Sequence, residues 1–208
     1  MKFISAWAFC ANISAGWAAA FVAATLSGCT MENISAPNKP DPTQTHVLLL
    51  PPLDVTPDSA HMLAPRQTVI LRCEKDDFEA RHFKILDEAV AAKAADSVPR
   101  IDLTRQSSRT KANLERLARR TGADWVVSIV VEKVTASNVD HGAFTARTQV
   151  LLQTWDASRR GWLANGLYTG QDSGNMPVWA FMHSLENATQ TALTNVWNVA
   201  SPEPPAKP

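Results

Sequence analysis

The sequence predicts an α/β fold: a mixed sheet with a carboxy-terminal antiparallel hairpin, packed by about three helices. Three observations support this prediction. Short apolar runs alternate with segments of helical spacing through the first half of the chain. Two strand-like segments then flank a turn at 156–161, and a last segment of helical spacing follows Pro177. The chain has 208 residues, 45% hydrophobic and 19% charged, which is the composition of a globular domain.

The first segment is predicted to be an export signal rather than part of the fold. No charged residue occurs from Phe3 to Met31, and Lys2 precedes this run. Alanine dominates it, where a stable membrane span of about 20 residues would carry leucine and isoleucine. One early lysine, an apolar middle and small residues at the end are typical of a secretory signal peptide, here expected over residues 1–28.

The end of this segment, Leu26-Ser27-Gly28-Cys29, resembles the lipobox of bacterial lipoproteins. The resemblance implies cleavage between Gly28 and Cys29, a diacylglycerol on the cysteine sulfur and a fatty acid such as palmitate on the new amino group. Two or more lipid chains together give stable anchoring in a bilayer. Thr30, in place of aspartate, implies by resemblance to the enterobacterial sorting rule an outer-membrane lipoprotein facing the periplasm. The alternatives are an ordinary signal peptide with an incidental cysteine, and a membrane anchor.

Two proline-rich segments bound a single domain expected over residues 46–200. Residues 29–45 comprise the lipidated Cys29 and a polar linker, which could extend about 50 Å from the bilayer. Residues 201–208 form a Pro-rich tail that cannot continue a helix.

Apolar runs and turn residues define the elements expected in the first half of this domain. His46–Leu50 is a buried strand that Pro51-Pro52 ends. We expect a loop over 54–65, a strand over 68–72, a helix over 76–95, a strand over 100–103 and a helix over 109–121. The apolar stripe of the first helix comprises Phe78, His82, Ile85, Leu86 and Ala89. His82 on this stripe is interpreted as a partly buried structural histidine.

The second half contains the clearest strand. Residues 125–131 are apolar on both faces, which predicts a strand in a sheet covered on both sides. Gly122 before it is expected to end the preceding helix in the left-handed conformation. Residues 144–153 and 162–171 are the two strands of the hairpin. A final helix over 178–199 carries an apolar stripe of Val178, Phe181, Leu185, Ala188, Ala192 and Val196.

From Leu114 to Gln171 the sequence resembles one superfamily of bacterial envelope proteins. The resemblance rests on Leu-Ala-Arg-Arg-Thr-Gly-Ala-Asp at 117–124, the apolar strand after it and the paired strands of 149–166. This superfamily includes the TolB amino-terminal domain, the curli-secretion lipoprotein family and the lipoprotein activators of penicillin-binding proteins. The resemblance implies a non-enzymatic protein–protein interaction module of the outer membrane, acting on peptidoglycan synthesis or secretion machinery.

Motifs for catalysis, cofactors and metals are missing from the sequence. It contains no Gly-x-Ser-x-Gly, phosphate loop, His-Glu-x-x-His or Cys-x-x-Cys, and its five histidines lack metal-ligand spacing. We therefore expect no enzyme, no cofactor and no metal. Cys73 is interpreted as a buried small hydrophobe. The alternative to a binding protein is an envelope hydrolase that uses a loop with Asp54, Asp58, Ser59 and His61, which are also ordinary turn residues.

The distribution of charge indicates a binding surface. The chain has 20 basic and 20 acidic residues, and this neutrality argues against a nucleic-acid binder that works by phosphate neutralisation. Arg100 to Arg120 nevertheless holds seven basic residues against two acidic ones. This segment is either a solvated helix face or a docking site for an acidic partner or anionic lipid headgroups. The candidate partner-binding residues are Arg105, Arg109, Arg116, Arg119 and Arg120.

These features predict an outer-membrane lipoprotein, held to the bilayer through acylated Cys29, whose periplasmic domain binds another envelope protein. The basic helix and the polar face of the hairpin strands are the expected recognition surfaces. A structural subunit of a secretion or export assembly is the first alternative, and the hydrolase is the second. No motif identifies the partner or the oligomeric state.

Overall fold

The computed structural model describes residues 40–57, 63–98, 101–139 and 143–200. The predicted signal peptide, Cys29 with residues 30–39, and the tail over 201–208 lie outside the described residues. The elements are β1 His46–Leu49, β2 Leu53–Asp54, α2 Leu63–Ala80, β3 Lys84–Leu86, α3 Glu88–Asp96, the 3-10 helix η2 Gln106–Ser108, α4 Lys111–Thr121, β4 Trp125–Val139, β5 Ala143–Asp156, β6 Gly161–Gly174 and α5 Pro177–Ala200. The predicted α/β fold is confirmed.

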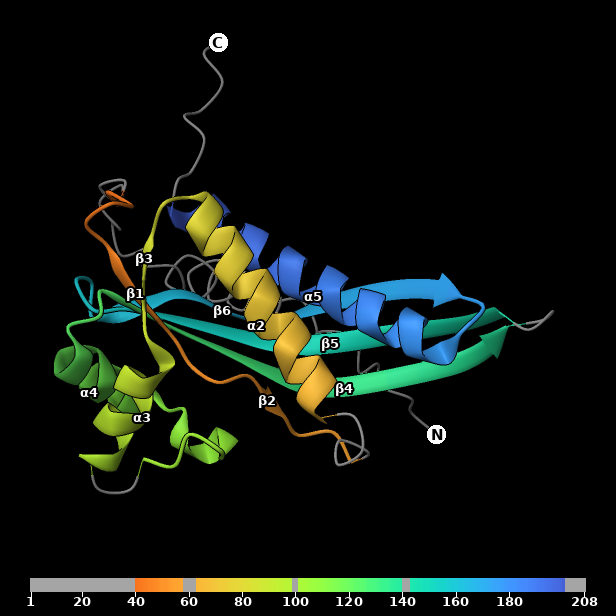
Figure 1. Cartoon of the computed structure of the whole chain (residues 1–208), viewed down its shortest axis with the longest axis horizontal. Helices are drawn as coiled ribbons and strands as arrows, with labels where there is room; N and C mark the ends of the chain where they lie inside the picture. The colour runs from red at the N-terminus through yellow and green to blue at the C-terminus, as the bar shows by residue number, and fades with distance from the viewer. Residues whose placement is uncertain (1–39, 58–62, 99–100, 140–142, 201–208) are drawn as a thin grey trace, which may run out of the picture. The chain divides into compact units, whose positions relative to one another are not determined.

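The sheet is mixed, as predicted. Its strands follow the order β3-β1-β4-β5-β6, and β2 pairs with β4 beyond the end of β1. β1 is parallel to both β3 and β4, whereas β4, β5 and β6 are antiparallel. The last three strands continue past β2 as a hairpin arm (Figure 1), which we define as residues 132–139, 143–149 and 169–174.

Helices cover both faces of the sheet (Figure 1). α2 and α5 pack on one face, where they bury Val127 and Ile129 of β4. α3 and α4 pack on the other face, where Leu114 meets Val126. The first half of β4 is therefore covered on both sides, as its apolar sequence predicted.

Between residues 63 and 80 the structure differs from prediction. The strand expected over 68–72 and the start of the helix expected over 76–95 form one helix, α2. Branched side chains at 68–70 favour a strand. Burial nevertheless recurs at helical spacing, at Arg66, Val69, Ile70, Cys73, Glu74 and Phe78. Packing of this stripe on the sheet outweighs the local propensity.

The helix expected over 76–95 is interrupted after Ala80. His82 closes α2 in the left-handed conformation, with φ +66°, and its side chain is exposed. The interpretation of His82 as partly buried is therefore wrong. Residues 84–86 form β3 because the free edge of β1 offers them hydrogen-bonding partners. A separate helix, α3, then begins after Asp87, whose carboxylate accepts from the N–H of Ala89.

One more predicted element differs in type. Strand β2 was not predicted, and β4 continues to Val139, past the predicted end at 131, whereas the other elements end within three residues of their predicted bounds. Residues 101–104 form a turn rather than the expected strand over 100–103, because the Asp102 carboxylate accepts from the N–H and hydroxyl of Thr104. Helix α4 buries Leu114, Leu117 and Ala118 on one face, and Gly122 ends it with φ +72°, as predicted for this glycine. In α5 the predicted stripe is buried from Leu185 onward, whereas Val178 is exposed.

Helix α5 lies directly on the hairpin arm at Gly170. A Cβ atom at this position would lie 2.1 Å from the carbonyl oxygen of Ser184 and 2.2 Å from the nitrogen of Ala188. Beside it, the hydroxyls of Thr148 and Ser184 are 2.7 Å apart. The missing side chain lets the helix backbone approach the strand, and this contact fixes the start of α5 beside the end of the arm.

Candidate interaction surfaces

Arg109, a predicted partner-binding residue, lies in the interior. It is 3% exposed. Its guanidinium donates to the carbonyl oxygens of Pro51 and Leu103 and to the hydroxyl of Ser128. Burial lowers the pKa of the guanidinium to about 10, although Glu74 opposes this shift. Arg109 is thus a structural residue, and its side chain is not accessible to a partner.

The sequence explains why an arginine is needed at this place. Proline has no N–H, so Pro51-Pro52 interrupts the pairing between the first strands and β4. Pairing reaches Leu50 and resumes at Leu53. The carbonyl of Ile129 lies in the interval and accepts from the Arg109 guanidinium at 3.4 Å. Arg109 therefore supplies the donor that the two prolines lack.

Glu74 of α2 is a second buried charged residue, and it is fully buried. Among the described residues, neither carboxylate oxygen has a hydrogen-bond partner. Burial raises the pKa of Glu74 to about 8, against the opposing effects of Arg109 and Lys75. The carboxyl group is therefore mostly protonated at neutral pH.

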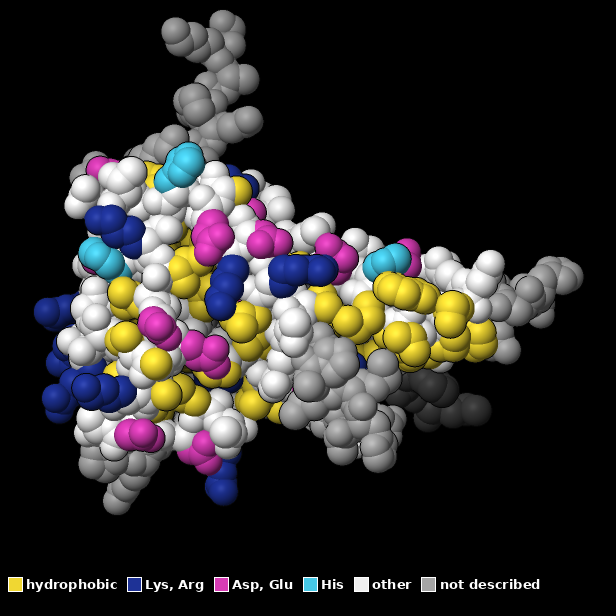
Figure 2. All heavy atoms as spheres, in the orientation of Figure 1, with side chains coloured by type: hydrophobic (Ala, Val, Ile, Leu, Met, Phe, Trp, Pro, Cys, Tyr) yellow, Lys and Arg dark blue, Asp and Glu magenta, His cyan; other side chains and the backbone are white. Residues whose placement is uncertain are grey.

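The exposed arginines of α4 join those of the turn between β5 and β6. We name the combined surface the basic end; it comprises Arg116, Arg119, Arg120, Arg159 and Arg160. The two segments meet at Asp124, whose carbonyl accepts from the N–H of Ala157 at 2.8 Å. Figure 2 shows Lys and Arg side chains gathered at this end of the sheet, over α4.

A hollow of about 480 Å³ lies within the basic end, bounded by Val98 and the three arginines of α4. Two of the five arginines have nearby carboxylates: Arg119 lies 3.9 Å from Glu115, and Arg159 lies 3.4 Å from Asp156. In the part of the chain that the structure describes, the other three have no ion-pair partner. Unpaired cations around a hollow form a surface suited to anions.

Arg105, the remaining predicted partner-binding residue, precedes η2 and lies apart from this hollow. Its guanidinium forms an exposed ion pair with Asp102 at 3.0 Å. Exposed pairs of this kind contribute little to stability. Of the five predicted residues, the structure therefore brings three together, isolates one and buries one.

An exposed apolar cluster, absent from the sequence prediction, lies at the end of the hairpin arm. Met176, Val178 and Trp179 at the start of α5 are 57, 50 and 58% exposed. Figure 2 shows hydrophobic side chains gathered there, at the end of the sheet opposite the basic end. We name these three residues the apolar tip. Its sequence signal is the run Met-Pro-Val-Trp at a helix start with no acidic residue in the first turn.

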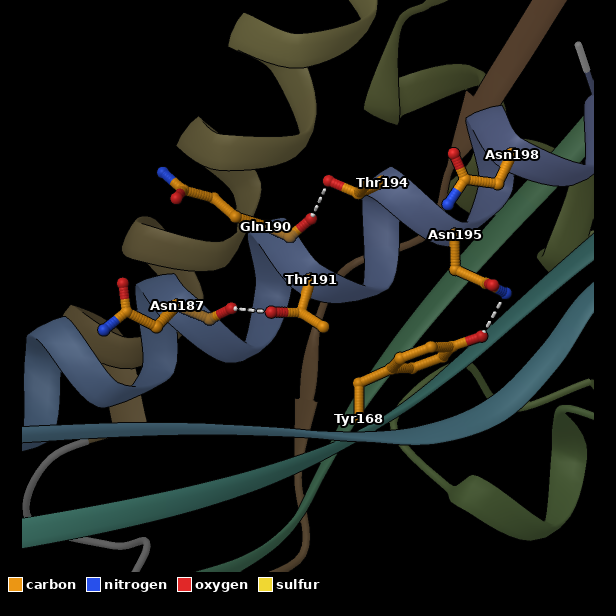
Figure 3. A pocket seen from close by; sticks show the side chains of 7 residues that line it. All are labelled: Tyr168, Asn187, Gln190, Thr191, Thr194, Asn195 and Asn198. Atoms are coloured by element: carbon orange, nitrogen blue, oxygen red, sulfur yellow. Dashed lines mark hydrogen bonds between the residues drawn. The ribbon is translucent and has the colours of Figure 1, made fainter. Parts of the chain in front are cut away.

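Between the two ends, α5 and β6 form an open hollow of about 570 Å³ (Figure 3). Its lining is uncharged: Tyr168, Asn187, Gln190, Thr191, Thr194, Asn195 and Asn198. The Asn195 amide donates to the Tyr168 hydroxyl, and the two threonine hydroxyls donate to helix carbonyls. Several of these groups thus satisfy one another. This face separates the charged end from the apolar end.

The loop considered for a hydrolase contributes one described residue to a buried ion pair. The Asp54 carboxylate accepts from the Arg66 guanidinium at 2.7 Å and from the Thr56 hydroxyl at 2.6 Å. Both members of the ion pair are buried. Asp58, Ser59 and His61 lie outside the described residues. Asp54 is therefore engaged in holding β2 to α2.

Cys73 is buried, as predicted, and burial raises the pKa of its thiol to about 11. The described residues contain no group of three His, Cys, Asp or Glu side chains that would hold a metal ion. Nor does any described helix combine the length and apolar character needed to cross a bilayer.

Comparisons with known proteins show similarity of fold. No protein-family model matches the sequence, and no curated protein sequence matches it. Bacterial lipoproteins are among the solved structures with a similar fold. Lipoprotein GNA1162 from Neisseria meningitidis is 16% identical with a TM-score of 0.47, over 73% of this chain and 99% of that chain. The hypothetical protein CT253 from Chlamydia trachomatis is 14% identical with a TM-score of 0.47, over 76% and 98%.

The C-terminal domain of LpoB from Salmonella enterica is 14% identical with a TM-score of 0.38, over 62% of this chain and 84% of that chain. Likeness at these identities and scores concerns the fold alone.

Proposed function

We propose that this protein is a lipoprotein of the bacterial outer membrane, anchored through acylated Cys29, whose periplasmic domain docks an envelope protein through the apolar tip. Peptidoglycan synthesis or secretion is the process we assign to this partner. The lipobox at residues 26–29 supports the anchor. The apolar tip supports the docking function.

The observation that carries the proposal is the exposure of Met176, Val178 and Trp179 as neighbours. Other large exposed apolar residues lie singly on different elements, such as Val90 on α3 and Leu167 on β6. Single exposed apolar residues are normal, whereas clustered ones mark binding sites. Tryptophan also dominates the energetics of many protein interfaces. The tip therefore has the composition of the centre of an interface.

Binding rather than catalysis is the activity we propose. Asp54, the one described member of the candidate hydrolase loop, is held by Arg66 and Thr56. The lining of the hollow on α5 contains no carboxylate, histidine, lysine or cysteine. The chemistry that the described surface presents is apolar at one end and cationic at the other.

Site-specific photocrosslinking in cells tests the docking function. A photoreactive amino acid replaces Trp179 in the full chain, and adducts are analysed by mass spectrometry. Leu167 is the matched control position, because it is 57% exposed yet isolated. We expect a defined protein adduct from position 179 and none from position 167.

Two results would change the proposal. An adduct of two copies of this chain would favour the alternative, a subunit of a secretion assembly. Equal labelling from both positions, or none from either, would overturn the tip as the docking site. The anchor is tested separately by the mass of the membrane-extracted chain, which should start at Cys29 with about three acyl chains and lose them in the Cys29→Ala variant.

A further inference from the structure

The place where the chain enters the domain lies beside the basic end. The chain turns at Asp41, whose carbonyl accepts from the N–H of Thr45 at 3.0 Å. The next residue, His46, donates its N–H to the Asp124 carboxylate at 2.8 Å. Asp124 is also the residue where α4 and the turn between β5 and β6 meet. The amino-terminal side of the domain and the exposed arginines therefore share one end of the sheet.

The linker length keeps this end close to the anchor. Residues 30–39 separate Cys29 from Pro40, the first described residue. A chain of this length spans at most about 40 Å when fully extended. A domain tethered through acylated Cys29 is thus confined near the bilayer, with the basic end as the part attached to the tether.

The five arginines of the basic end outnumber the carboxylates that form ion pairs with them. Glu115 and Asp156 offset Arg119 and Arg159. Arg116 and Arg120 remain beside the hollow next to Val98, and Arg160 lies in the adjacent turn. Like charges repel one another, so an anionic partner that faces this cluster is attracted by several arginines at once.

We infer that the basic end binds the phosphate groups of anionic lipids in the membrane that holds Cys29. This inference rests on the proposed lipid anchor. Tethering raises the local concentration of headgroups around the arginines and so adds to the affinity that the free domain has for an anionic surface. Guanidinium groups are suited to this role because they present several donors to phosphate oxygens.

The inference fixes the orientation of the domain. Strand β6 begins immediately after Arg160 and ends two residues before Met176. Its 14 residues span about 45 Å. With the basic end on the membrane, the apolar tip is displaced along β6 toward the periplasm. A partner that is not itself in the same membrane can then reach it.

Vesicle binding tests the inference on the mature chain, with Cys29→Ser in place of the acylated residue. The probes are vesicles of phosphatidylglycerol and phosphatidylcholine in equal parts, and vesicles of phosphatidylcholine alone. We expect cosedimentation with the anionic vesicles only, and its loss at about 0.5 M salt, where screening is strong. Equal binding to both vesicles, or binding to neither, overturns the inference.

Two double variants with the same change in charge locate the site. Arg116→Glu with Arg120→Glu should weaken partitioning at least about 30-fold, since each cation near an anionic surface contributes roughly fivefold. Lys133→Glu with Arg147→Glu, on the exposed face of the hairpin arm, should leave partitioning within about twofold. Equal loss in both would assign the binding to net charge and contradict a site.

A conservative pair tests whether positive charge at the basic end is sufficient for binding to the anionic vesicles. Arg116→Lys with Arg120→Lys keeps the charge, so binding to the anionic vesicles should stay within about threefold. Loss of vesicle binding in this pair would show that positive charge at these two positions does not suffice, and it would overturn binding to the lipid surface through charge. Circular dichroism of each variant verifies folding. Crosslinking from position 179 and acylation of Cys29 are measured independently, so failure of this inference is distinguishable from failure of the proposed function.

Discussion

The two ends of the described domain differ from an ordinary protein surface in different ways, because one is rich in arginine and the other is apolar. At the basic end, arginines outnumber the carboxylates that could pair with them. At the apolar tip, Trp179 and its neighbours are more than half exposed or nearly so. Mixed charge would suffice for solubility at either end. Each end therefore has a composition that solubility does not explain, and each fits a different ligand.

The two ends also differ in what holds them to the sheet. The basic end follows Arg109, which ties the start of α4 to the gap left by Pro51-Pro52. The apolar tip begins α5, which contacts the hairpin arm backbone to backbone at Gly170. Hydrogen bonds from the buried Arg109 guanidinium hold the basic end. At the apolar tip, the absence of a side chain at Gly170 allows the close contact between α5 and the hairpin arm. Mutations at these two positions should therefore disturb the ends separately.

Among substitutions outside the apolar core, the largest loss of stability at a fixed pH is expected for Arg109→Ala. It leaves the carbonyls of Ile129 and Leu103 without their donor in a buried region. We expect the free energy of unfolding to fall by about 4 kcal/mol, measured by urea denaturation. Arg116→Ala, at an exposed arginine of the same segment, should change it by less than about 0.5 kcal/mol. Similar losses for both would mean that Arg109 is not the structural residue of the pair.

The next effect is a dependence of stability on pH through Glu74. Its pKa in the folded chain is about 8, against an ordinary value of 4.5. The folded state therefore holds a proton that the unfolded state releases, so stability falls as pH rises from about 4.5 to about 8 and then levels off. The fall should amount to a few kcal/mol, at about 1.4 kcal/mol for each unit of pKa.

Glu74→Gln should remove this fall, because the amide does not ionise. Urea denaturation across pH 4 to 9 measures the difference between the two curves. Glu115→Gln, at a half-buried residue on α4, is the control and should keep the fall of the unmodified chain. If the free energy of unfolding changed with pH in the same way for Glu74→Gln and the unmodified chain, Glu74 would not be the buried, protonated group that causes the fall.

A smaller loss of stability is expected at the other end, for Gly170→Ala. The added methyl group would overlap the backbone of α5, which must shift outward. We expect a loss of about 2 to 3 kcal/mol in the free energy of unfolding, as for other overpacked sites. Gly174→Ala adds the same group where nothing lies within 4 Å and should be nearly neutral. If Gly170→Ala were equally neutral, α5 would not be fixed by this contact.

Sequence patterns predicted the elements in which burial and propensity agree. The apolar run of 125–131 and the stripe of α4 lead to the same elements in the structure. In residues 63–96 the pattern of burial and the local propensity favour different elements. Branched residues at 68–70 favour a strand, yet the surrounding stripe packs as a helix. Strand β3 forms because β1 offers a free edge, which is information from a distant part of the chain.

The binding surface was predictable in part, for the same physical reason. The excess of basic residues between positions 100 and 120 identified the arginines of α4 as a candidate binding surface, because the number of charged residues in a segment can be read from the sequence alone. It did not separate Arg109 from them, since that distinction depends on the two prolines at 51–52 and on a carbonyl of β4. The apolar stripe predicted for residues 178–199 likewise did not include Trp179. Its exposure depends on where α5 projects along the hairpin arm.

The smallest effect on stability sharpens the distinction between surface and core. Trp179→Ser and Arg120→Ala each remove an exposed side chain, so each should change the free energy of unfolding by less than about 0.5 kcal/mol. Trp155→Ser, at a fully buried tryptophan, should cost about 3 to 5 kcal/mol and serves as the control. Urea denaturation of the three variants measures these differences. A large loss for Trp179→Ser would mean that the apolar tip supports the fold. A negligible loss, combined with lost crosslinking to the partner, would assign its exposed area to binding, because folding alone gives no reason to keep a tryptophan there.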